Sequence, residues 1–273
     1  MSHVIVITGA SSGIGEALAK RFAMPGNILG LIARNQPRLE AVADQCRVLG
    51  AEVTTGCVDV RDATAIEHWL LAFDTKNPVD LLIVNAGILR GALGVSHEPL
   101  DIVRAQIDTN LIGALNTTIP LVGRMEARGR GQIALMCSLA AFAPHPDWPG
   151  YCAVKSALLT YGRMLRERMR GSGVKINVIA PGWVTAPINE PFVMWRPFEV
   201  SPEVAAVRIA RGLARNQSVI AFPWPLAASA WISGLFPAWL RRKGYRLFRA
   251  TYRNSSPDAS VDMTGRSGGT HLL

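Results

Sequence analysis

A glycine-rich turn near the start of the chain constrains its fold more than any other feature. Residues 4–7, Val-Ile-Val-Ile, are all β-branched, which is typical of a strand buried on both faces. The turn TGASSGIG follows at residues 8–15, and Ile14, Leu18 and Phe22 then repeat at helical spacing. A strand, a glycine turn and a helix in this order place backbone N–H groups at a helix N-terminus, where they can bind a pyrophosphate. Because glycines let the backbone approach such a ligand closely, we expect a nucleotide site here.

Strand and helix patterns alternate along the rest of residues 1–222. We expect further strands at residues 28–33, 53–60, 79–84, 132–137, 175–179 and 218–222, and helices at residues 37–49, 63–73, 100–128, 151–170 and 203–215. Repeated βα units predict an α/β fold, a Rossmann-like, doubly wound parallel sheet of about seven strands with helices on both faces. Ligands bind beyond the carboxyl ends of such strands. The residues expected there are Ser11, Asp59, Asn85, Ser138 and Pro181.

Tyr151 and Lys155 lie four residues apart and share one face of the helix expected at residues 151–170. A free tyrosine has a pKa of ~10, too high for proton exchange near neutrality. A lysine charge held nearby favours the phenolate and lowers that pKa, as general acid–base catalysis requires. We therefore expect a catalytic pair, for which a half-buried Tyr and a surface Lys at a chance spacing are the structural alternative.

Motifs in a fixed order run through residues 1–222. They are TGASSGIG at 8–15, Asp59-Val60, NAG at 85–87, Asn110, Ser138, YCAVK at 151–155 and PGWVT at 181–185. In this order and spacing the chain resembles the short-chain dehydrogenase/reductase family. The resemblance implies hydride transfer between a nicotinamide cofactor and a carbonyl/alcohol pair.

The resemblance also implies roles for individual residues. Tyr151 would exchange a proton with the substrate oxygen, and Ser138 would hydrogen-bond that oxygen. Lys155 would lower the Tyr151 pKa and hold the nicotinamide ribose, while Asn110 would hold a water that relays protons from Lys155. The implied cofactor-binding residues are Gly9, Ser11, Ser12, Gly13, Ile14, Gly15, Arg34, Asp59, Val60, Asn85, Ala86, Gly87, Tyr151, Lys155, Pro181, Gly182 and Thr185.

The end of the second expected strand bears on cofactor choice. An NAD site uses an Asp or Glu there, which accepts hydrogen bonds from the ribose hydroxyls. This chain has Ala33-Arg34-Asn35 and no carboxylate. A guanidinium suits the 2′-phosphate of NADP by charge and bidentate geometry. We expect NADP(H) as the preferred cofactor and leave NAD(H) open, since Arg34 in plain solvent is the structural alternative.

Two segments are expected to border the substrate. The apolar side chains Phe192, Val193, Met194, Trp195 and Phe198 predict an apolar wall. Residues 143–149, just before Tyr151, contain three prolines that would stiffen the opposite rim. His145 in this loop could touch substrate, although a loop histidine in water is the simpler expectation.

The C-terminal region is basic. The net charge is +9, and residues 204–257 contain nine Lys or Arg and no Asp or Glu. Residues 220–240 carry no charge, include Trp224, Trp231 and Trp239, and are interrupted by three prolines, which argues against a membrane-spanning helix. Tryptophans beside the basic run at residues 241–249 fit an anionic membrane interface. Packing of residues 223–249 on the core or a dimer partner is the alternative.

Composition indicates the class of protein and its cellular compartment. A chain of 273 residues with 49% hydrophobic and 18% charged residues is an ordered globular protein. The four cysteines show neither CxxC pairing nor histidines at ligand spacing, so we expect reduced thiols and no metal site. The first apolar run is too short for a signal peptide. We therefore expect a cytoplasmic protein, or one at the inner face of a membrane, that forms a dimer or tetramer and has no nucleic-acid partner.

Together these features predict three segments and one activity. Residues 1–222 would form the dinucleotide-binding and catalytic domain, residues 223–254 a mainly helical apolar and basic extension, and residues 255–273 a flexible tail. The expected activity is that of an NADP(H)-dependent oxidoreductase acting on CH–OH groups, with an apolar carbonyl or alcohol as substrate. A catalytically idle nucleotide-binding module that binds a partner or membrane is the alternative. A nucleotide-sugar epimerase or dehydratase would also use Tyr and Lys, but would need a larger C-terminal domain.

Overall fold

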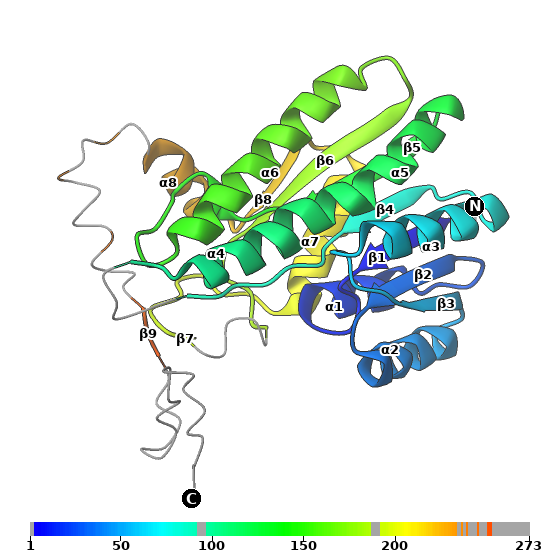
Figure 1. The fold of residues 1–273 in the computed structure, drawn as a ribbon, viewed down its shortest axis with the longest axis horizontal. Helices are drawn as coiled ribbons and strands as arrows, with labels where there is room; N and C mark the ends of the chain where they lie inside the picture. Colours follow the sequence, from blue (N-terminus) through cyan, green and yellow to red (C-terminus); the bar gives the residue numbers. More distant parts are fainter. Residues whose placement is uncertain are drawn as a thin grey trace, which may run out of the picture.

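A single parallel sheet organises the molecule. The computed structural model describes residues 3–91, 97–186 and 192–233, together with 236, 239, 245 and 250–252. Within these residues seven strands pair in the order β3-β2-β1-β4-β5-β6-β8 (Figure 1), and every pairing is parallel. The strands are β1 (Val4–Thr8), β2 (Ile28–Ala33), β3 (Glu52–Cys57), β4 (Leu81–Val84), β5 (Gly131–Met136), β6 (Val174–Pro181) and β8 (Val219–Phe222). The predicted doubly wound sheet is confirmed.

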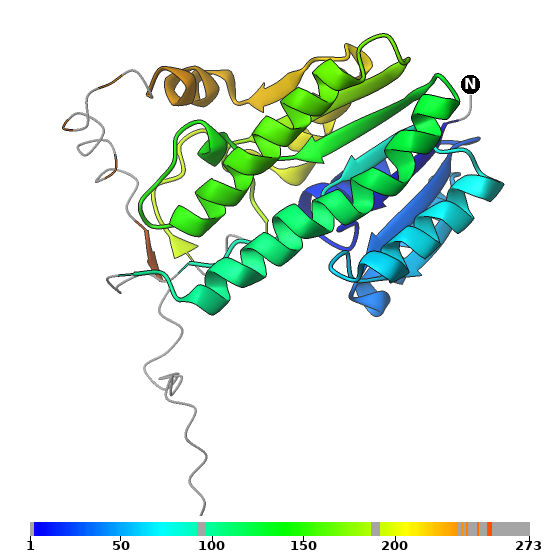
Figure 2. The same cartoon turned by 45° about the horizontal axis from the view of Figure 1, so that its top comes forward.

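Helices cover both faces of the sheet, as Figures 1 and 2 show from two directions. One face carries α1 (Gly13–Phe22), α2 (Gln36–Val48) and α7 (Pro202–Ala214). The other carries α3 (Ala63–Lys76), α4 (Leu100–Gln106), α5 (Gly113–Ala127) and α6 (Pro149–Arg168). Each face has its own buried core, with Leu18, Leu39 and Ile209 in the first and Leu70 and Leu158 in the second. Because apolar residues line both faces, the strands are nearly continuous hydrophobic runs.

Most element boundaries lie within a few residues of those expected, and two differences affect the site. The third strand ends at Cys57, because the Val58 N–H bonds back to the Gly56 carbonyl and turns the chain out of the sheet. Asp59 therefore follows the strand instead of ending it. The long helix expected at residues 100–128 is interrupted by a π-helical segment, Ile107–Ile112, between α4 and α5.

The described part of the C-terminal extension contains a helix and a short strand. Helix α8 (Trp224–Ser233) follows β8 directly. Strand β9 (Thr251–Tyr252) pairs antiparallel with β7 (Phe192–Val193). Among the described residues, none of the helices has the length and apolarity needed to cross a bilayer. The predicted tail at residues 255–273 and most of the basic run at residues 241–249 lie outside the described residues.

Candidate active site

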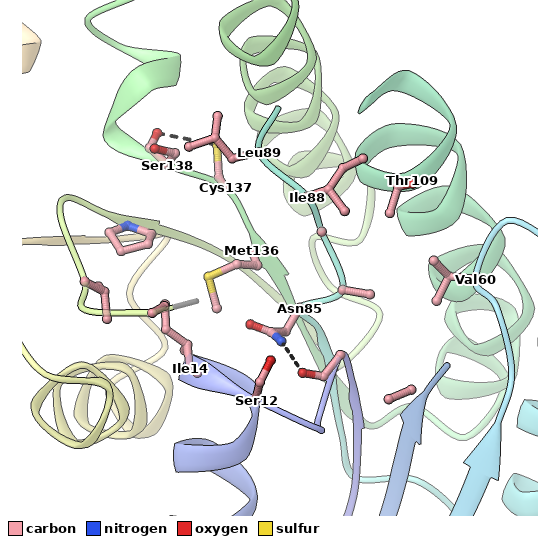
Figure 3. Close-up of a pocket in the computed structure, with 18 of the residues that line it drawn as sticks. Ser12, Ile14, Val60, Asn85, Ile88, Leu89, Thr109, Met136, Cys137 and Ser138 are labelled. Atoms are coloured by element: carbon pink, nitrogen blue, oxygen red, sulfur yellow. Dashed lines mark hydrogen bonds between the residues drawn. The ribbon is translucent and has the colours of Figure 1, made fainter. Parts of the chain in front are cut away.

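A cleft of about 380 Å³ opens at the carboxyl ends of the central strands. Figure 3 shows that residues of the glycine turn (Ser12, Ile14), the end of β4 (Asn85) and the end of β5 (Met136, Ser138) line it together. The site thus lies where parallel strands of a doubly wound sheet leave room for a ligand.

The glycine turn is packed so tightly that only glycine fits at two of its positions. Gly9 has a φ of +66°, and a Cβ on it would lie 2.8 Å from the Ala86 Cα. A Cβ on Gly15 would collide with the Gly9 carbonyl oxygen. The turn therefore lies directly against the end of β4, and its backbone forms the floor of the cleft. Ser12, the N-cap of α1, makes no capping bond with its side chain.

Asn85 and Thr8 tie the turn to the NAG motif. The Asn85 amide donates to the carbonyls of Thr8 (2.9 Å) and Gly9 (3.2 Å). In return, the Thr8 hydroxyl accepts from the backbone N–H groups of Asn85 and Ala86, both at 3.1 Å. Four hydrogen bonds thus fix two motifs that lie far apart in the sequence, at the ends of the neighbouring strands β1 and β4.

The structure brings Ser138, Tyr151 and Lys155 together at the other end of the cleft. Ser138 follows β5, and Tyr151 and Lys155 lie one turn apart on α6. The buried Lys155 ammonium donates to the Met136 carbonyl at 2.9 Å and lies 5.6 Å from the centre of the Tyr151 ring. The Ser138 hydroxyl accepts from the Ala140 N–H at 3.1 Å.

The electrostatics of the pair differ from expectation. Burial raises the pKa of the Tyr151 phenol above its ordinary value, and the hydrogen bond from Ser138 opposes that rise only in part. Burial likewise lowers the pKa of Lys155. The lowered tyrosine pKa that the spacing predicted is thus wrong for the protein alone, because loss of solvation outweighs any help from Lys155. The apolar setting instead keeps Tyr151 protonated, in the form that can donate a proton.

Asn110 lies beside the cleft and does not line it. Its side-chain oxygen accepts from the Ile88 N–H at 2.7 Å, and its amide donates to the Ile88 carbonyl at 2.8 Å. It is 1% exposed and sits in the π-helical segment, a type of irregularity that is frequent at functional sites. Both polar atoms of the side chain are therefore occupied in holding Ile88, which does line the cleft.

Arg34 lies at the edge of the cleft, near the end of β2. Its guanidinium Nη1 is 3.6 Å from the Asp59 carboxylate, and its side chain is 56% exposed. Asp59 is bound more closely by Arg61, with Nη2 at 2.6 Å from Oδ2, and this hydrogen bond lowers the Asp59 pKa. Because Arg61 holds the Asp59 carboxylate more closely than Arg34 does, and Arg34 is more than half exposed, the Arg34 guanidinium can also bind an anion in the cleft.

We call the end of the cleft beside Tyr151 the substrate end. It is apolar, and most of the residues that form it differ from those predicted. Trp148 and Trp183 line it, with ring centres 6.4 Å apart. Of the predicted wall, Met194 packs in the same cluster. Val193, Trp195 and Phe198 are exposed, and the Phe192 side chain lies outside the described residues.

His145 is not in open water as the simpler expectation held. Its side chain is 12% exposed and packs between the rings of Trp148 and Tyr245.

Nearly all the predicted site residues line the cleft. The exceptions are Gly15, Asn110 and Thr185. Several lining residues were not predicted, although they flank recognised motifs. Those nearest the motifs include Ile88 and Leu89 after NAG, Trp183 within PGWVT, and Trp148 shortly before Tyr151. Apolar residues immediately next to a motif are the signal that could have found them.

Comparisons with known proteins agree on one family. The sequence profile described as short chain dehydrogenase matches residues 3–197. An uncharacterized oxidoreductase of Myxococcus xanthus is 32% identical over 85% of this chain and 92% of its own length. A 3-dehydrosphinganine reductase of Arabidopsis thaliana is 34% identical over 73% of this chain, which spans only 61% of that relative. An NADP-dependent 3-hydroxy acid dehydrogenase of Salmonella typhi is 31% identical over 66% of this chain and 72% of its own length.

The fold has close relatives among solved structures. A short-chain dehydrogenase from Sphingobium yanoikuyae in complex with NADPH has a TM-score of 0.73 at 23% identity and covers 90% of this chain and 96% of its own. Levodione reductase has a TM-score of 0.74 at 24% identity and covers 83% of this chain and 98% of its own. Both show the same fold. With its matched profile and its relatives, this chain is an oxidoreductase of the short-chain dehydrogenase/reductase family.

Proposed function

We propose that the protein transfers hydride between NADP(H) and an apolar carbonyl or alcohol. The observation that carries this proposal is the placement of Ser138, Tyr151 and Lys155 at one end of a cleft whose other end is the glycine turn. A dinucleotide fits the residues present, because the glycine turn and the N-terminus of α1, whose Ser12 side chain makes no capping bond, line the cleft beside the ends of β2 and β4. When bound, the nicotinamide ring supplies or accepts the hydride.

The residues of this chain would handle the substrate oxygen. Ser138 and Tyr151 offer two hydroxyls to that oxygen, which fixes its position and polarises the carbonyl. Because burial keeps Tyr151 protonated, its hydroxyl can donate the proton that the forming alkoxide needs in the direction of reduction. In that step the Tyr151 O–H bond breaks and the product O–H bond forms. Lys155, held close by the Met136 carbonyl, stabilises the phenolate that is left.

Arg34 supports NADP(H) as the preferred cofactor. It lines the cleft beyond the end of β2, and its exposed guanidinium offers planar donors to a 2′-phosphate. Asp59, the carboxylate nearest to it among the described residues, is engaged by Arg61. One relative of the chain is named an NADP-dependent dehydrogenase, which agrees with this assignment.

The substrate end supports an apolar carbonyl. Trp148, Trp183 and Leu89 surround the position that a substrate would take next to Tyr151. Relatives are named for 3-dehydrosphinganine and for 3-hydroxy acids, so 3-dehydrosphinganine and 3-oxo acids, the ketones that correspond to these names, make a suitable first panel.

Substitution of Tyr151 by Phe tests this function. The Phe variant keeps the ring and removes the proton, so kcat for any ketone that the wild type reduces should fall by at least about 100-fold, with the Kd for NADPH nearly unchanged. Ser138→Ala should lower kcat as well. Full turnover by the Phe variant would overturn the mechanism, and wild-type protein that binds NADPH but reduces no ketone would favour the idle module.

The exposed surface of α7 and α8 supports a second role, contact with an anionic membrane surface. Arg208, Arg211 and Arg215 line an open groove beside Trp224, which is 77% exposed. Trp231 lies seven residues further along α8, two turns away on the same face, and is 54% exposed. Among the described residues, no carboxylate forms an ion pair with these three arginines. Arginines and exposed tryptophans on one surface match the charge and interface chemistry of anionic lipid.

A further inference from the structure

The chain returns to the active site after α8. Ala250 is 6% exposed and belongs to one buried cluster with Trp148 and Cys152, against which Tyr151 and Trp183 also pack. Trp148, Tyr151 and Trp183 line the cleft, as do Leu89 and Ala140 of the same cluster, whereas Cys152, Met194 and Ala250 pack behind them. A residue from the C-terminal extension is thus packed against the residues that surround the expected substrate position.

Two contacts fasten this segment to the loop before α6. The Asp147 carboxylate accepts a hydrogen bond from the Ala250 N–H at 2.9 Å. His145 Nε2 lies 3.3 Å from the Tyr245 carbonyl oxygen, and the rings of His145 and Tyr245 meet edge to face with centres 5.5 Å apart. Both acceptor and ring are largely buried, with side chains 19% and 12% exposed. Side chains of the loop that precedes Tyr151 therefore hold backbone groups of the C-terminal segment.

The same segment is fastened on the other side to the region after β6. Strand β9 pairs with β7, with Thr251 opposite Val193. The Thr251 hydroxyl also donates to the Val193 carbonyl at 3.3 Å. Residues 250–252 thus connect both rims of the substrate end, and these rims come from parts of the chain on either side of α6 and β6.

We propose that Ala250, anchored by Asp147, supports from behind the wall of the substrate subsite that Trp148 and Trp183 line, and so limits the size of the substrate. This inference rests on the proposed function and deepens it. The Ala250 side chain is a single methyl group, which leaves room for the Trp148 and Trp183 rings. A longer side chain at position 250 would push into the cluster that holds these rings. The C-terminal extension would then act as part of the substrate site.

Substitution of Ala250 by Leu, with Ala127→Leu as its matched control, tests the wall. Ala127 is exposed at the end of α5, whereas Ala250 is buried, so the same substitution at position 127 adds bulk away from the cluster. With a series of ketones of increasing bulk, Ala250→Leu should lower kcat/KM for the bulkiest by at least about tenfold relative to the smallest. The control should keep the wild-type profile, and both variants should keep the wild-type Kd for NADPH.

A second variant keeps the test decisive if Ala250→Leu fails to fold. Asp147→Ala removes the anchor and should raise KM across the series without changing the Kd for NADPH, while Asp147→Asn, which retains an acceptor oxygen, should restore KM. A wild-type size profile in Ala250→Leu, or a wild-type KM in Asp147→Ala, would contradict the role proposed for Ala250 but not the proposed function. Absence of turnover by the wild type on every ketone would overturn the proposed function and the wall with it.

Discussion

Glu98 accepts a hydrogen bond at 2.8 Å from the backbone N–H of Gly150, 52 residues away, at the first turn of α6. Trp148, the N-cap of that helix, has no side chain able to accept this bond. The other Glu98 oxygen accepts from the buried Gln106 amide of α4 at 3.2 Å. The helix that carries Tyr151 and Lys155 is thus capped by a carboxylate from a separate segment, and that carboxylate also suits the positive end of the helix dipole.

Loss of this cap should disturb catalysis as well as stability. Glu98→Ala should lower the free energy of unfolding by about 1 kcal/mol. It should also lower kcat several-fold, since the first turn that positions Tyr151 loses its support, while the Kd for NADPH stays constant. Glu98→Gln retains an acceptor and should recover most of kcat. A loss of stability with unchanged kcat would limit Glu98 to a structural role.

Cofactor preference should follow the charge at position 34. Arg34→Asp should weaken NADPH binding by ten- to a hundredfold, since a charge-assisted pair contributes roughly 1.5–3 kcal/mol. NADH binding should improve, because a carboxylate can accept from a free 2′-hydroxyl. Fluorescence titration of both cofactors gives the two Kd values. Arg104→Asp makes the same charge change at an exposed site on α4 and should alter neither. Equal affinity of the wild type for NADPH and NADH would contradict the assignment.

Stability in acid should depend on Asp74. Its carboxylate is 1% exposed, and it accepts from Arg128 at 2.7 Å, Arg124 at 3.1 Å and the Val79 N–H at 2.9 Å. Burial raises its pKa, but these hydrogen bonds outweigh burial and the net pKa is lowered. Because the folded pKa lies below the unfolded one, the stabilisation is complete above the unfolded pKa of ~4 and is lost as pH falls through the folded pKa.

Asp74→Asn should therefore destabilise the protein at neutral pH by about 3 kcal/mol, since it leaves two arginines without their carboxylate. Its denaturant midpoint should fall less steeply than that of the wild type between pH 5 and pH 3. Parallel curves for the two proteins across this range would show that Asp74 does not carry the acid sensitivity.

Membrane contact should be visible in vesicle co-sedimentation. The wild type should sediment with anionic vesicles and not with neutral ones, and added salt should release it. Reversing Arg211 and Arg215 to Glu should abolish binding, because each basic residue contributes about 1 kcal/mol. Lys76→Glu, on the opposite face of the sheet, should bind as the wild type does. A dimer that dissociates in the Trp224→Ala variant, with no vesicle binding by the wild type, would assign this surface to self-association.

Motifs were predictable from sequence where function needs particular residues at strand ends. Gly9, Asn85 and Ser138 lie in short signals whose positions follow from the alternation of strands and helices, so their meeting at one cleft could be foreseen. The Tyr151 pKa could not, because it depends on burial by Trp148 and Trp183, which only tertiary packing decides. The contact of Ala250 with that cluster likewise joins residues about 100 positions apart, a distance over which no local pattern carries information.

The position of Ala250 also bears on the order in which the protein is made. Every described residue that lines the cleft precedes residue 187, so those that would bind the nucleotide and move the proton have all been synthesised before β8. Chains are made from the N-terminus, and domains tend to fold as they emerge. If Ala250 completes the substrate wall, the protein acquires its nucleotide site before its choice of substrate, which waits until residue 250 has been added.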